Sequence, residues 1–158
     1  MKISAKQLGD DGEEFTLRLL ESRGFTATRL PVNAKTYDLR VQRDGSEFLV
    51  SVKVSREKQH VRLGARRSVL GLRSGNFVFA YLPTPGEQIT SLATSPHSLL
   101  ILPAELARED ALSIHDRYWN DRCRDPNIFS VMVKGYGSRH RAMWSRWLAF
   151  KDAWSQLP

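Results

Sequence analysis

The sequence contains few of the residues from which several common kinds of site are built. Cys123 is the only cysteine among 158 residues, which excludes an internal disulfide and a metal site made of cysteines. No apolar run approaches the roughly 18 residues that cross a bilayer. The first residues also lack the apolar core of a signal peptide. We therefore expect a cytoplasmic protein with no membrane partner.

Two classes of catalytic motif are absent as well. The four histidines show no metal-ligand spacing, and we expect all of them at the surface: His60, His97, His115 and His140. The segment LGARRSVLG lacks the lysine and the strand-helix context of a phosphate-binding loop. Neither a histidine-bound metal nor a nucleotide-binding loop is predicted.

Acidic residues are too few to balance the basic ones, and the formal net charge is +7. Between residues 53 and 73 the only acid is Glu57. A basic field on one segment suits a polyanion, and nucleic acid is the commonest one. The alternative is a solvated loop that only keeps the protein soluble. The candidate contacts to a nucleic-acid backbone are Arg56, Lys58, Arg62, Arg66 and Arg67.

The hydrophobic pattern predicts one α/β domain over residues 1–158, with a mixed central sheet flanked by helices. A helix is expected over residues 12–23, ended by Gly24, and another opens after Pro103 with AELARED. The Asp-Gly pair at 44–45 predicts a tight hairpin. Residues 55–75 are expected to form a partly ordered loop with a short helix. Strands are expected at 25–30, 37–41, 48–54, 76–82, 98–102 and 129–133, and a last helix at 142–156.

Three charged residues are predicted to meet on this framework. Side chains alternate along a strand, so Leu49, Ser51 and Lys53 share a face, and Asp38 approaches them from the partner strand of the hairpin. Glu13 is expected at the start of the first helix. The two carboxylates would hold Mg²⁺ through oxygen ligands, and this metal polarises a phosphoryl oxygen and activates water. The lysine would stabilise charge on the phosphate, so the pattern favours a hydrolytic site.

These segments also resemble a known family. GEEFTLRLLESRGF followed by YDLRVQRDGSEFLVSVKVS is similar to the core of the PD-(D/E)XK nuclease superfamily, in particular its small restriction-endonuclease-like and Holliday-junction-resolvase-like members. Gly12-Glu13 and Gly24 match the family's first helix, Asp38 its metal-binding aspartate, and Lys53 its catalytic lysine. The resemblance implies a nuclease acting on DNA with Mg²⁺ or Mn²⁺, with Glu13 and Asp38 as metal ligands. Many such proteins form homodimers, so a homodimer is an open alternative.

The resemblance fails at Ser51, where the family has its second acid. Serine is a poor Mg²⁺ ligand, and its presence removes one negative charge from the site. Glu47 lies about 13 Å away along the strand, while Glu14 and Glu57 would have to bend inward to replace the acid. A catalytically inactive nucleic-acid-binding module on the same fold is therefore a second hypothesis, and a module that binds an acidic protein partner is a third.

Each of the three charged residues also has a simpler interpretation. Lys53 would protect an edge strand from aggregation. Asp38 would be an acid in a turn or at the surface. Glu13 would interact with the dipole at a helix N-terminus.

Overall fold

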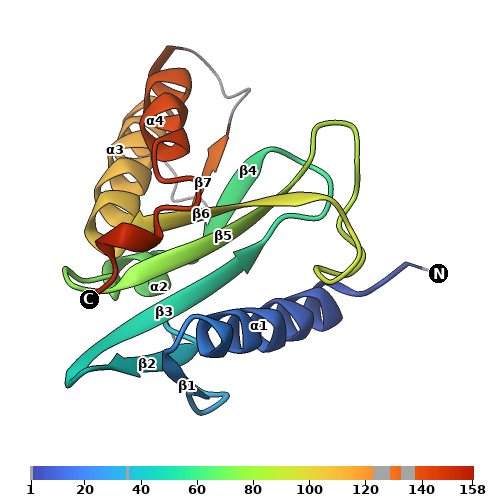
Figure 1. Ribbon diagram of the computed structural model, residues 1–158. Coiled ribbons are helices and arrows are strands. Elements are labelled where there is room, and N and C mark those ends of the chain that lie inside the picture. The colour runs from blue at the N-terminus through green and yellow to red at the C-terminus, as the bar shows by residue number, and fades with distance from the viewer. Residues whose placement is uncertain (1, 35, 123–128, 133–137) are drawn as a thin grey trace.

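The computed structural model describes residues 2–34, 36–122, 129–132 and 138–158 (Figure 1). Cys123 and the end of the last predicted strand, residue 133, lie outside the described residues. No helix within the described ranges is long and apolar enough to cross a membrane. In chain order the elements are α1 (Ala5–Ser22), β1 (Thr26–Arg29), β2 (Leu39–Arg43), β3 (Ser46–Val54), β4 (His60–Gly64), α2 (Arg66–Leu70), β5 (Phe77–Pro83), β6 (His97–Pro103), α3 (Ala104–Arg122), β7 (Phe129–Met132), α4 (Ser138–Leu148) and the 3-10 helix η1 (Trp154–Gln156).

A five-stranded mixed sheet forms the centre of the molecule, in the order β1-β2-β3-β5-β6. β3 and β5 run parallel, and the other neighbouring pairs are antiparallel. Asp44 and Gly45 join β2 to β3 with φ angles of 51° and 79°, as a two-residue hairpin turn requires. The predicted α/β class, a mixed sheet flanked by helices, is confirmed.

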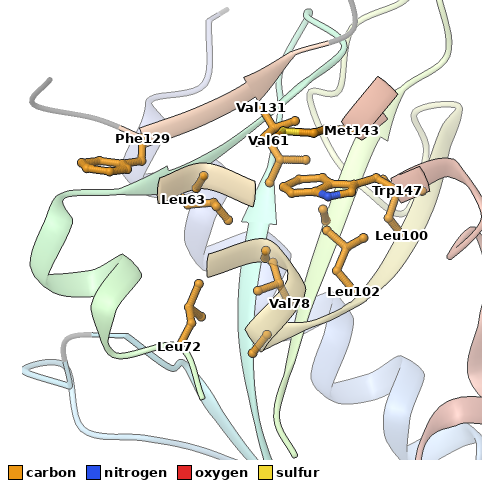
Figure 2. Packing of buried hydrophobic residues seen from close by; sticks show 14 of the residues in the cluster. Val61, Leu63, Leu72, Val78, Leu100, Leu102, Phe129, Val131, Met143 and Trp147 are labelled. Carbon is orange, nitrogen blue, oxygen red and sulfur yellow. The ribbon is translucent and has the colours of Figure 1, made fainter. Parts of the chain in front are cut away.

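Each face of the sheet is covered by different elements. α1 lies on one face, whereas α3 and α4, with the β4–β7 pair, lie on the other (Figure 1). β5 contributes to both cores because its side chains alternate: Phe79 packs with the α1 side and Val78 with the α3 side. Figure 2 shows Trp147 of α4 packed in the core on the α3 side. Its indole nitrogen donates to the carboxylate of Asp110 of α3 at 2.8 Å.

Helix α1 begins at Ala5, well before the predicted start at residue 12. Ser4 caps it: the hydroxyl of Ser4 accepts from the backbone N–H of Gln7, and the Gln7 side chain accepts from the N–H of Ser4. Reciprocal bonds of this kind satisfy two otherwise free donors at a helix start. Glu13 therefore lies in the middle of the helix, and its interpretation as an N-terminal carboxylate is wrong.

The basic segment is more ordered than predicted. Residues 55–75 contain the expected short helix, α2, but also the strand β4, which pairs with β7 in a separate two-stranded sheet. Val61 and Leu63 of β4 are buried against the α3 side of the central sheet. Their burial holds the strand in place and leaves Arg62, the residue between them, exposed.

The predicted continuous helix over residues 142–156 is wrong. α4 ends at Leu148, and the chain then runs along β6, the edge of the central sheet. The N–H of Ile101 donates to the carbonyl of Phe150 at 2.9 Å, and the N–H of Asp152 donates to the carbonyl of Leu99 at 3.0 Å. The free backbone groups of the edge strand are satisfied in this way, which outweighs the helical preference of the segment.

Candidate active site

The site lies where β2 leaves β3. Their pairing ends at Leu39 and Val50, so within the described part of the chain residues 51–54 of β3 have no strand neighbour on that side and pair only with β5. Asp38 occupies the start of this open edge. Its N–H donates to the carbonyl of Val50 at 2.8 Å, and its carboxylate accepts from the N–H of Val52 at 2.7 Å. Asp38 thus replaces the missing strand pairing, and its interpretation as a surface acid is wrong.

Lys53 belongs to the central strand of the sheet, between β2 and β5 (Figure 1). At Lys53 itself β3 pairs, among the described strands, only with β5, so this residue lies on the open edge, and a lysine that protects an edge strand stays an alternative prediction. It stands opposite Ala80 of β5, whose side chain lies in the core on the α3 side. Burial lowers the pKa of Lys53, and the carboxylates of Asp38 and then Glu13 raise it in partial compensation.

Glu13 reaches the same place from α1 because the residue before it has no side chain. A Cβ at Gly12 would lie 2.5 Å from Cγ2 of Val54 and 3.3 Å from Cγ1 of Val52. Gly12 therefore lets the helix backbone contact β3 closely. Burial raises the pKa of Glu13, and the nearby carboxylate of Asp38 raises it further.

The three predicted residues thus form one electrostatic cluster. The pKa of Asp38 is raised by burial, an effect partly offset by the Val52 hydrogen bond and by Lys53. The pKa of Glu13 and the pKa of Lys53 are likewise each shifted by the charges of the other two residues of the cluster. Partly buried carboxylates beside a half-buried lysine cost free energy of folding, and such perturbed groups are concentrated at functional sites.

The two carboxylates fit a magnesium site of the open kind. Mg²⁺ is commonly bound by one or two carboxylates, with waters and substrate phosphates completing the coordination. A cation here would favour the ionised forms of Glu13 and Asp38, both of which burial disfavours. Within the described residues no group of three His, Cys, Asp or Glu side chains is arranged to hold a metal. The two carboxylates therefore suit an ion whose coordination is completed by water, and not one that is enclosed by protein ligands alone.

None of the three glutamates considered in the sequence analysis takes the place left by Ser51. Ser51 is 1% exposed, and its hydroxyl has no hydrogen-bond partner among the described residues. The three glutamates considered as replacements are bonded elsewhere: Glu14 to Arg18 and Arg29, Glu47 to Arg40 and Gln42, and Glu57 to Gln88. The cluster therefore has two carboxylates where the resemblance implies three.

The five predicted nucleic-acid contacts are not equivalent. Arg56 donates to the backbone carbonyl of Ile3, and the guanidinium of Arg66 lies over the Phe129 ring, 5.2 Å from its centre. Both are thus engaged within the protein. The remaining three are exposed: Lys58, Arg62 and Arg67.

Three histidines were placed incorrectly at the surface, and one of them, His97, is half-buried. His115 is buried, with its ring centre 4.0 Å from that of Phe129, and its Nε2 accepts from the N–H of Ser130. His60 is half-buried and lines a cavity with Lys53. The strand that holds His60 had a short signal in the sequence, because polar and apolar residues alternate from 60 to 63.

Comparison with solved structures supports the fold. The chain is similar to the bacterial homing endonuclease I-Ssp6803I, with a TM-score of 0.52 and 16% identity over 98% of this chain and 91% of the other. The chain has a nuclease-like fold. It is also similar to the Holliday junction resolvase Hjc of Archaeoglobus fulgidus, with a TM-score of 0.48 and 15% identity over 78% of this chain and 83% of the other. No protein-family model and no curated protein sequence matches the chain.

The close contact at Gly12 predicts opposite effects for two glycines of the same helix. Gly12→Ala places a methyl group against Val54, and we expect it to lower the free energy of unfolding by about 1–3 kcal/mol. Gly9→Ala meets nothing within 4 Å, so alanine should stabilise the helix by about 0.5–1 kcal/mol. Urea denaturation of both variants measures the difference, and equal effects would contradict the proposed role of Gly12.

Proposed function

We propose that the protein is a nuclease that hydrolyses phosphodiester bonds of DNA with Mg²⁺ or Mn²⁺. The observation that supports this most strongly is the cluster at the open edge of β3, where Glu13, Asp38 and Lys53 come together from a helix, a loop end and a strand. The fold shared with a homing endonuclease is consistent with DNA as the substrate, as is the net charge of +7.

The residues of the cluster have separate roles in this proposal. Glu13 and Asp38 hold the metal ion, which when bound polarises the phosphoryl oxygen and lowers the pKa of a coordinated water. The hydrogen bond from Val52 fixes the Asp38 carboxylate. Lys53 donates a charge-assisted hydrogen bond to the phosphate as its negative charge grows. The exposed Lys58, Arg62 and Arg67 hold the DNA backbone on either side.

The expected result is cleavage of DNA that requires a divalent metal and Lys53. Lys53→Met keeps most of the side-chain volume and removes the charge, so we expect the rate to fall by about 10²-fold with the fold retained. Supercoiled, linear, branched and single-stranded DNA, each with Mg²⁺ or Mn²⁺, are assayed by gel. Lys6→Met, a matched change on the exposed side of α1, should cleave like the wild type. Absence of cleavage in every combination would overturn the proposal.

The serine at position 51, where the resemblance implies an acid, favours a second candidate, a catalytically inactive nucleic-acid-binding module. The hydroxyl leaves the cluster with two carboxylates, which weakens metal binding. This candidate predicts salt-sensitive binding of DNA or RNA without a divalent metal. It also predicts that neither the wild type nor Lys53→Met cleaves nucleic acid. Fluorescence anisotropy in EDTA over a range of salt concentrations separates the two candidates when combined with the cleavage assay.

A further inference from the structure

A cavity of about 110 Å³ lies beside Lys53, on the side of the sheet that faces β4. Its walls come from the carboxyl-terminal part of β3, the start of β4 and the neighbouring part of β5. Three basic side chains line it: Lys53, His60 and Arg62. Of the described residues that line it, none is acidic.

The sequence of β4 concentrates positive charge at this cavity. Val61 and Leu63 are buried in the core on the α3 side. Because side chains alternate along a strand, His60 and Arg62 point the other way. This charge acts on His60: burial lowers its pKa, and the charges of Arg62 and then Lys58 lower it further. An anion bound in the cavity would oppose the effect of these two positive charges and would therefore raise the pKa of His60.

The imidazole of His60 has unused hydrogen-bonding capacity. Its Nδ1 is enclosed and has no hydrogen-bond partner among the described residues. Polar atoms of buried side chains nearly always have a partner. Because Nδ1 is enclosed by protein atoms, the contact of His60 with the cavity is made by the rest of the ring. The volume of the cavity is several times what a single water requires.

Hydrogen bonds within the preceding loop hold these residues in position. The N–H of Ser55 donates to the carbonyl of Tyr81 at 3.0 Å, and the side chain of Gln59 donates to the carbonyl of Pro83. The hydroxyl of Ser55 also donates to the carbonyl of Lys58. The loop between β3 and β4 is thereby fixed to β5. Binding an anion would therefore cost little ordering of the protein.

We propose that this cavity binds a phosphate group of a nucleic-acid backbone, held by Arg62, His60 and Lys53. Lys53 lines the cavity and also belongs to the cluster with Glu13 and Asp38, so the bound phosphate is a near neighbour of the one that reacts. This inference rests on the proposed nuclease function, because that function supplies the reacting phosphate to which the bound one is a neighbour. It specifies the substrate class: a polynucleotide with a phosphate beside the cleaved bond, and not a mononucleotide.

The first test uses metal-free protein, so that it does not depend on catalysis. Inorganic phosphate is titrated in EDTA, and the pKa of His60 is followed by NMR, with the ring signal assigned from His60→Gln. We expect saturable binding that raises the pKa of His60 by about one unit. Arg62→Gln should abolish the rise, whereas Arg18→Gln, a matched change on the exposed side of α1, should preserve it. No rise, or an equal rise in Arg62→Gln, would overturn the proposal.

The second test identifies the source of the phosphate. DNA oligonucleotides carry one neutral methylphosphonate in place of a single phosphate, at each position near the cleaved bond. One position should lower kcat/KM about tenfold in the wild type, because a charge-assisted hydrogen bond is lost, and less than twofold in Arg62→Gln. Cleavage that is insensitive at every position would contradict the phosphate site while leaving the nuclease function intact.

If no DNA is cleaved, the same oligonucleotides are used for binding by anisotropy. A position whose neutralisation weakens binding by the wild type but not by Arg62→Gln would support the phosphate site after the nuclease function had failed. Equal affinities for all the oligonucleotides would overturn the site as well.

Discussion

Replacing Asp38 by asparagine is expected to lower metal-dependent DNA cleavage by about 10³-fold and to leave the fold intact. Asparagine keeps an oxygen that can accept the hydrogen bond from Val52, so the open edge of β3 stays satisfied. What it removes is the negative charge that, with Glu13, would hold the metal. Cleavage rates and metal titrations of the purified variant measure the two losses.

The same variant should be more stable than the wild type at neutral pH. Burial raises the pKa of Asp38 above its ordinary value of 3.8, so the folded protein binds the proton more tightly than the unfolded chain does. The resulting stabilisation is fully present below 3.8 and is lost as pH rises through the folded-state pKa. The asparagine of the variant would be neutral throughout, and its advantage should therefore appear as pH rises and vanish in acid.

Thermal unfolding of the wild type and Asp38→Asn across that range, in EDTA, checks the sign. Asp44→Asn is the matched control, because Asp44 is an exposed turn residue where asparagine is equally suitable. A variant that is less stable than the wild type at pH 7, or whose stability difference does not depend on pH, would contradict the assigned burial of the carboxylate.

The fold was largely predictable because its elements have local signals. Each local signal determines one element: alternation predicts the strand at 48–54, the Asp-Gly pair predicts the hairpin turn, and Gly24, with a φ of 86°, marks the end of α1. The prediction of the fold is wrong where residues far away in the sequence determine the local structure. The segment around Phe150 leaves its helix in order to satisfy the edge of β6, and no local pattern contains that edge. The early start of α1 had a local signal, the Ser4-Gln7 capping pair.

The candidate site was predictable in its members but not in its setting. Spacing and alternation place Asp38 and Lys53 on one face, and the register of β2 on β3 agrees with this. The sequence does not show that β2 ends at Leu39, which leaves the open edge that Asp38 fills. It also gave no indication that His60 would line a cavity with Lys53, because this follows from the burial of Val61 and Leu63 against the α3 side of the sheet.

Replacing Ser51 by glutamate is expected to change stability and activity in opposite directions. Ser51 is 1% exposed, and an uncompensated buried carboxylate costs several kcal/mol. In EDTA the Ser51→Glu variant should therefore unfold at a lower temperature than the wild type. A divalent metal would compensate the added charge together with those of Glu13 and Asp38, so Mg²⁺ should restore stability and increase the cleavage rate.

The size of the metal effect distinguishes a completed site from general stabilisation. A ligand at 100 times its dissociation constant adds about 2.7 kcal/mol, which corresponds to a rise in Tm of about 5–10 °C for a chain of this size. Ser51→Gln has the same volume without the charge, and its Tm should respond to Mg²⁺ no more than that of the wild type does. If Ser51→Glu shows no larger response than Ser51→Gln, then residue 51 does not face the ion held by Glu13 and Asp38. The two carboxylates would then act without a contribution from this position on β3, and the lack of an acid at residue 51 would have no bearing on catalysis.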